Sequence, residues 1–229
     1  MGNVSMLVVC VAVIFSLVSV SQTAPVSQTC EELLKPLEMK TTDPLKGKWS
    51  VVATSNNQPG AKTLNTVLIT NIWWDIVPGT QDNMVDAIIY TKMYGECSSK
   101  IFNISAENNN LSWIYIVPST AVFLPTCADC LLIQTTTTIN GNTYTSLDLA
   151  SKRRVLNDAE LVQFTTQLDC LNMPSKVVFN PKMGLCPEIS GPTPDPEELY
   201  RALVNFMEMD LLADKGHKPG MLEKTTASH

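Results

Sequence analysis

The sequence has little charge and almost no histidine. Only 17% of the 229 residues are charged, and the two histidines are His217 and His229. A catalytic triad or a zinc site built on histidine therefore cannot be assembled from the central part of the chain. The 16 basic and 22 acidic residues give a net charge of −6, which makes nucleic acids poor partners.

Several enzyme motifs are also absent. The sequence contains no G-x-S-x-G, no glycine-rich phosphate loop and no H-E-x-x-H. Its hydrophobic content of 45% is too high for intrinsic disorder. We therefore expect a folded protein that is not an enzyme and that needs neither a metal nor another cofactor.

The longest apolar run lies at the N-terminus. It covers the fifteen residues 6–20, and no charged side chain precedes Glu31. A membrane-spanning helix needs about 20 residues, whereas a short apolar run followed by small polar residues is typical of a secretory signal. We expect residues 1–24 to be a cleaved signal peptide and the protein to be secreted, without stable membrane insertion. An uncleaved anchor is the alternative.

Secretion places the remaining cysteines in an oxidising compartment, where disulfides form. After removal of Cys10, the chain keeps six cysteines, namely Cys30, Cys97, Cys127, Cys130, Cys170 and Cys186. Six cysteines allow 15 pairings, so spacing alone does not select one. N-glycosylation sequons begin at Asn103 and Asn110, and we expect a glycoprotein.

The composition of the region 47–152 is typical of β-sheet. Short runs of Thr, Val, Ile, Tyr and Trp are separated by Asn, Gly and Pro, and Asn140-Gly141 is a strong hairpin signal. The expected strands are 49–54, 64–77, 84–94, 100–105, 111–117, 129–139 and 143–150. An eighth, truncated strand is expected in the stretch 151–156.

A helix and a last strand follow. Asn157 and Glu160 form a capping-box pattern, and Leu161, Phe164 and Leu168 recur at helical spacing before Pro174. Residues 176–179 predict a short strand. The simplest closed form is an all-β, eight-stranded antiparallel up-and-down barrel with one C-terminal helix packed outside. A barrel of this size encloses room for one small ligand.

The organisation predicted from these patterns has three parts. Residues 1–24 are the signal peptide, and residues 25–190 are the barrel domain. Residues 191–229 begin with a proline-rich linker, continue as a short amphipathic helix and end in a disordered tail.

Particular motifs resemble a known family. Gly47-Lys48-Trp49 is similar to the G-x-W signature of lipocalins, and residues 161–179 with Cys186-Pro-Glu188 resemble the alpha-1-acid glycoprotein (orosomucoid) branch. That branch includes the tributyltin-binding proteins of fish and the saxitoxin- and tetrodotoxin-binding proteins of pufferfish. The second lipocalin motif is absent.

The resemblance implies several structural roles. Gly47 and Trp49 would be structural, with Trp49 closing the barrel floor and Arg153 or Arg154 covering its ring. Cys30 would pair with Cys170, and Cys97 with Cys186.

Cys127-Ala-Asp-Cys130 departs from the branch, and three interpretations compete. The favoured one is a local disulfide, which requires a turn because cysteines three apart in an extended strand lie about 10 Å from each other. The others are a thioredoxin-type redox centre and a pair of free thiols that bind a soft metal or an organometal.

The strands offer a set of candidate ligand contacts. They are Val51, Trp73, Ile89, Tyr90, Trp113 and Tyr115. Val51, Ile89 and Tyr115 match pocket positions of the resembled branch, and Asp75 or Asp86 would favour a cationic ligand. The alternative for each aromatic residue is packing between barrel and helix.

The predicted function is that of a secreted carrier. It would bind a small hydrophobic ligand, including a cationic or organometallic toxin or xenobiotic, in the barrel lumen for transport, sequestration or detoxification. The rival hypothesis is a secreted immunomodulatory protein of the acute-phase type. It would bind a cell-surface receptor or a plasma lipoprotein through its surface or tail.

Overall fold

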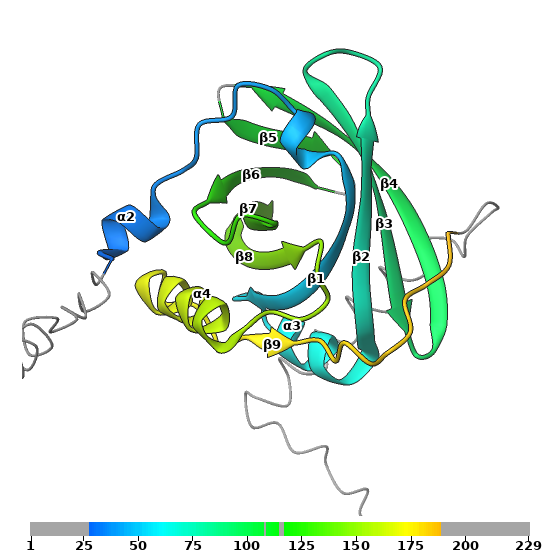
Figure 1. Ribbon diagram of the computed structural model, residues 1–229, viewed down its shortest axis with the longest axis vertical. Helices are drawn as coiled ribbons and strands as arrows, with labels where there is room; N and C mark the ends of the chain where they lie inside the picture. Colours follow the sequence, from blue (N-terminus) through cyan, green and yellow to red (C-terminus); the bar gives the residue numbers. More distant parts are fainter. Residues whose placement is uncertain (1–27, 108, 115–116, 189–229) are drawn as a thin grey trace, which may run out of the picture.

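The computed structural model describes residues 28–107, 109–114 and 117–188 (Figure 1). The predicted signal peptide and the predicted tail lie outside these residues. The helical elements are α2 (Cys30–Leu34), η1 (Asp43–Leu45), α3 (Ala61–Thr63), η2 (Leu64–Leu68) and α4 (Asp158–Cys170). The strands are β1 (Gly47–Asn56), β2 (Ile69–Pro78), β3 (Met84–Met93), β4 (Glu96–Glu107), β5 (Asn110–Ile114), β6 (Pro118–Leu124), β7 (Cys130–Ile139), β8 (Asn142–Ser151) and β9 (Val177–Val178).

Strands β1 to β8 form a closed antiparallel barrel, which confirms the predicted fold class. Each strand from β2 to β8 pairs with the next, and β1 closes the barrel by pairing with both β8 and β2. The short strand β9 adds to β1 beside Ala53 and Thr54, and α4 lies outside the barrel wall near it (Figure 1). The described residues contain no helix long and apolar enough to span a membrane.

The position of the eighth strand was predicted wrongly. It is β6 (Pro118–Leu124), between the expected fifth and sixth strands, whereas residues 152–156 form no strand. Pro118 looked like a strand terminator, but proline is tolerated at the first residue of a strand. Pro118 has this place in β6, opposite Ile114.

The start of the second strand was also predicted wrongly. Leu64–Leu68 is a π-helical turn that follows α3, and β2 begins only at Ile69. The segment contains the β-branched residues Thr66 and Val67, but Leu64 and Leu68 bury their side chains from this helical turn, as Ala61 does from α3. Tertiary burial therefore overrides the local strand propensity.

Two apolar layers organise the domain. One fills the barrel interior around Trp49, Trp74 and Phe123. The other lies between the barrel wall and α4, where Phe164 and Leu168 pack on β-strand leucines such as Leu149. The helix begins as predicted, because Asn157 and Glu160 form the reciprocal capping box.

Three disulfides pair the six described cysteines. Cys30–Cys170 joins α2 to the end of α4, Cys97–Cys186 joins β4 to the C-terminal segment, and Cys127–Cys130 closes a local turn. The two long-range pairs are those that the resemblance implies. They fasten the segments before and after the barrel to its outside.

Candidate functional site

The barrel lumen is the candidate site, and strand register identifies the residues that face it. On β8, Leu147 and Leu149 pack toward α4, so the alternate residues Asp148 and Ala150 face inward. Three predicted ligand contacts belong to the interior cluster. Val51 is buried in it, and Ile89 and Trp113 pack partly buried against it. These three remain our candidates for contact with a ligand.

Trp49 is buried in the interior cluster after η1, at the end of the barrel where β1 begins, which we call the floor. Its indole nitrogen donates to the carbonyl oxygen of Leu45 at 2.7 Å, and the Nζ of Lys152 lies 4.9 Å from the ring centroid. The covering cation is therefore Lys152 and not Arg153 or Arg154 as expected. Gly47 precedes Trp49 with φ of +106°, a backbone conformation that side-chain-bearing residues rarely adopt.

Trp73 and Tyr90 do not line the lumen, contrary to expectation. They alternate with Trp74 and Ile89, which face inward, and therefore project from the outer wall. There they form a separate buried cluster with Cys186, and the Trp73 indole nitrogen donates to the Cys186 carbonyl at 3.0 Å. Desolvation in this cluster raises the pKa of the Tyr90 hydroxyl.

Asp75 and Asp86, which were predicted to favour a cationic ligand, also lie outside the lumen. Asp75 and Asp86 occupy the same outward positions as Trp73 and Tyr90, so neither faces the lumen. Asp86 accepts a hydrogen bond from the Nδ2 of Asn103 at 2.7 Å on the exposed surface of β3 and β4. Tyr115 lies outside the described residues.

A polar group that the sequence analysis did not select lies inside the barrel. Asp148 faces the lumen from β8, where its Oδ1 accepts from the Thr54 hydroxyl at 2.6 Å and its Oδ2 from the Ser146 hydroxyl at 3.2 Å. Burial raises the pKa of this carboxyl, and the two hydrogen bonds oppose the rise. The signal was an acidic residue between two leucines in the middle of a predicted strand.

Along β7 and β8, the inward side chains change from polar to apolar near Asp148. Toward the β7–β8 turn, the inward positions hold Thr135, Thr137, Tyr144 and Ser146. Ile133 is paired with Asp148, and toward the floor the inward positions hold Leu131 and Ala150; all three belong to the apolar interior. The wall formed by β7 and β8 thus has an apolar inner part and a hydroxyl-rich outer part, and the carboxylate lies at the boundary.

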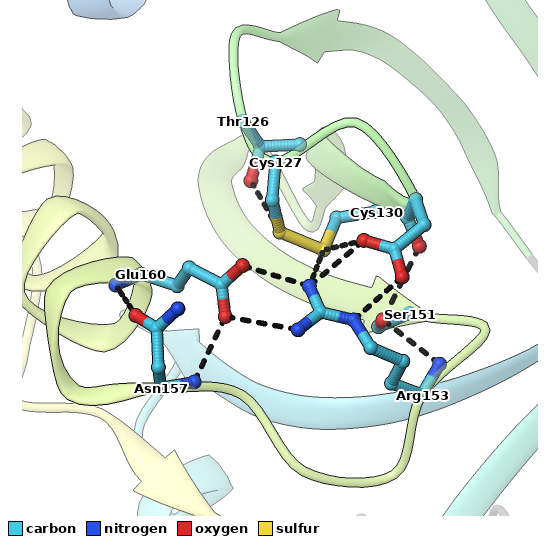
Figure 2. A network of polar contacts seen from close by, with 8 residues as sticks. Thr126, Cys127, Cys130, Ser151, Arg153, Asn157 and Glu160 are labelled. Carbon is cyan, nitrogen blue, oxygen red and sulfur yellow. Dashed lines mark hydrogen bonds and ion pairs between the residues drawn. A yellow bond between two sulfur atoms is a disulfide. The ribbon is translucent and has the colours of Figure 1, made fainter.

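The Cys127–Cys130 turn is a second cluster of reactive groups, outside the lumen (Figure 2). The two sulfur atoms are bonded to each other, as in the favoured interpretation. With Asp129 they form a group whose ligand atoms lie within 4.8 Å of one another. Disulfide sulfurs carry no thiolate charge, so this group lacks the soft ligands that a metal would require.

Arg153 stabilises this turn from the side. Its guanidinium donates to both carboxylate oxygens of Asp129, at 2.5 and 2.8 Å, and to Glu160 in the capping box at 2.7 Å (Figure 2). These hydrogen bonds lower the pKa of both carboxyls. The arrangement ties the disulfide turn to the start of α4 and has the features of a structural element.

The two sequons lie side by side on neighbouring strands. Asn103 and Asn110 are exposed on β4 and β5, and their hydroxyl residues Ser105 and Ser112 contact each other with 2.7 Å between the oxygens. Glycosylation of both asparagines remains a prediction. It would place carbohydrate over this outer face.

Comparison with known proteins finds similarity to solved structures. No protein-family model and no curated sequence matches the chain. Among solved structures, it is similar to an odorant-binding protein, OBP1, with 15% identity and a TM-score of 0.53 over 62% of this chain and 94% of that one. It is also similar to the siderocalin Ex-FABP (14%, TM-score 0.53, covering 62% and 97%) and to a dog lipocalin allergen (15%, 0.52, covering 63% and 99%). Identities this low establish the shared fold alone.

Proposed function

Because the chain has the lipocalin fold, we propose that it is a secreted carrier that reversibly binds a small hydrophobic ligand in the barrel lumen. The observation that carries the proposal is the closed barrel with an interior formed by Trp74, Phe102, Phe123 and neighbouring aliphatic residues. Small-molecule sites are concave and mostly apolar, with a few placed polar groups. The interior of this barrel has that composition.

The expected affinity follows from the ligand area. Burying about 300 Å² of apolar ligand surface at roughly 25 cal/mol/Å² contributes about 7 kcal/mol. Loss of translational and rotational freedom offsets part of this, so a Kd in the micromolar range is expected. Transport, sequestration or detoxification of a hydrophobic toxin or xenobiotic would be compatible with such reversible binding.

Secretion is part of the proposal. Three disulfides among six cysteines are typical of proteins that fold in an oxidising compartment. The similar proteins support a binding role as well, since one is described as an odorant-binding protein and another as functioning through dual ligand specificities.

The test is a titration of protein secreted from eukaryotic cells. The panel would contain steroids, fatty acids, basic drugs, tributyltin and guanidinium toxins, and tryptophan fluorescence and native mass spectrometry would be recorded. We expect one-to-one binding of at least one apolar ligand with a change in fluorescence. A folded protein that binds none of the panel would contradict the carrier function and favour the receptor- or lipoprotein-binding alternative.

A further inference from the structure

Asp148 occupies a position in the lumen that structural needs alone do not explain. Its neighbours Leu147 and Leu149 bury their side chains toward α4, while Asp148 points to the opposite side of the wall. The residue paired with it on β7 is Ile133, which packs against the apolar interior. An apolar side chain at this position would extend that interior without the cost of desolvating a carboxylate.

The carboxylate is only partly satisfied by the protein. Thr54 and Ser146 each donate one hydrogen bond, whereas an ionised carboxylate accepts about four. None of the ion pairs among the described residues includes Asp148. Asp148 also retains some accessible surface, and because it faces inward, that surface borders the lumen.

The surroundings define the shape of a matching ligand. Ile133 on β7 is paired with Asp148, Phe123 on β6 is paired with Ile133, and Leu131 lies one inward position closer to the floor. On the mouth side, the wall is formed by hydroxyl groups, including the Ser119–Thr137 pair with 2.9 Å between the oxygens. An elongated apolar body would fit toward the floor, with a polar group beside Asp148.

We propose that Asp148 anchors the head group of the ligand, and that the preferred ligands are lipophilic molecules that carry one protonated amine. This proposal rests on the proposed carrier function and narrows it to a ligand class. The ammonium group donates to the open acceptor positions of the carboxylate, and the apolar body covers the interior side chains. A charge-assisted hydrogen bond formed away from bulk water is among the stronger polar contacts.

The lumen holds other charged or titratable side chains besides Asp148. By register, the described inward positions also hold Glu96 at the end of β4, Lys100 on β4 and Tyr144 on β8. Lys100 lies on the wall opposite β8 and is the group that would attract an anionic ligand instead. Asp148 is therefore tested by substitution as well as by pH.

The experiment compares three probes that share one alkyl chain. Binding of decylamine, decanol and decanoate to the secreted protein is measured by calorimetry, with wild type, Asp148→Asn, Lys100→Met and Asp86→Asn. Asp86 is the matched control because it is an aspartate on the outer face of β3. A hydrogen bond to a charged group changes the affinity by roughly tenfold or more.

We expect wild type and Asp86→Asn to bind decylamine at least about tenfold more tightly than decanol. Asp148→Asn should lose that preference and keep its affinity for decanol. In the wild type, the preference for the amine should also fall on acidification, whereas decanol binding should not. This second readout needs no variant and does not depend on how Asp148→Asn folds.

Two results would overturn the proposal. One is an unchanged amine affinity in a folded Asp148→Asn variant. The other is a preference for decanoate that Lys100→Met removes. Both would leave the carrier function intact, because decanol or decanoate would still bind. Failure of all three probes to bind would instead contradict the carrier function itself.

Discussion

The rings of Trp73 and Tyr90 stack on the outer wall of the barrel, with 4.0 Å between their centroids and 4° between their planes. They lie on paired positions of β2 and β3, beneath the segment that the Cys97–Cys186 disulfide holds in place. Their immediate neighbours Trp74 and Ile89 face the opposite side. Adjacent tryptophans of one strand therefore report on different environments.

This arrangement predicts which tryptophan senses a ligand. Trp73→Phe should reduce total emission but leave the ligand-induced change intact, because Trp73 lies outside the lumen. Trp113→Phe should diminish the change, because Trp113 packs against the interior cluster. Fluorescence titration of both variants with one bound probe would check this. A change lost in Trp73→Phe and kept in Trp113→Phe would contradict the assignment of faces.

A second prediction concerns stability and Asp148. Its pKa is raised in the folded protein, so the folded state binds the proton more tightly than the unfolded chain does. Stability should therefore fall as pH rises from about 4, the unfolded value, through the raised folded value. Asp148→Asn removes this dependence, so the variant should gain stability relative to wild type over that window.

Urea denaturation at several pH values between 4 and 8, without ligand, measures the difference. The gain should be smallest at the acidic end and constant once the pH exceeds the folded pKa. A difference between wild type and Asp148→Asn that does not vary with pH would mean that the carboxyl titrates normally in the folded protein.

The ion pairs of Arg153 predict that stability falls as the pH is lowered, which is the opposite of the dependence expected for Asp148. It lowers the pKa of Asp129 and Glu160, and its own pKa is raised by the same contacts. The stabilisation is therefore present above about pH 4 and lost as the pH falls through the lowered values. Arg153→Ala should lower the Tm slightly at pH 7, because the Arg153 and Asp129 side chains are exposed, and not at all near pH 2. Arg154→Ala, whose partner is the Met183 carbonyl, is the control.

The disulfides predict a graded loss of stability. The chain-entropy relation assigns about 5 kcal/mol to a loop the size of Cys30–Cys170 and about 2 kcal/mol to one the size of Cys127–Cys130. The sequence separations are 140 and 3 residues. Replacing each pair by alanine and measuring urea unfolding should give the larger loss for Cys30–Cys170. Equal losses would show that local strain or unfolded-state structure dominates.

The sequence was sufficient to predict the barrel, the outside helix and its cap. Strand alternation, the Asn140-Gly141 hairpin and the reciprocal pair Asn157 and Glu160 are local signals, and the structure has each of them. The missing strand β6 and the π-helical turn at Leu64 depend on which neighbours bury them. That information is not present within a short window of sequence.

The side of the barrel wall on which a residue lies was harder to predict than the strand to which it belongs. The register shifts between Ile69 and Asn71, and between Val51 and Ala53, where an irregularity changes the alternation. In a pair such as Trp73 and Trp74, both residues are large and apolar, so composition does not tell inside from outside. Asp148 was detectable, since a carboxylate between two leucines in a strand is unusual, but its partner Thr54 lies on a distant strand.

Closure through β1 has a consequence for the order of folding. The Thr54–Asp148 contact joins residues 94 positions apart, and β1 gains its last partner only at Val177 and Val178. Hairpins β2–β3, β3–β4 and β7–β8 can form early because their strands are adjacent in the chain. The first strand can pair early with β2 through Gly47 to Ser50, but its pairing with β8 and β9 must wait for nearly the whole domain. During that interval its unpaired edge is the part of the nascent protein most open to intermolecular pairing.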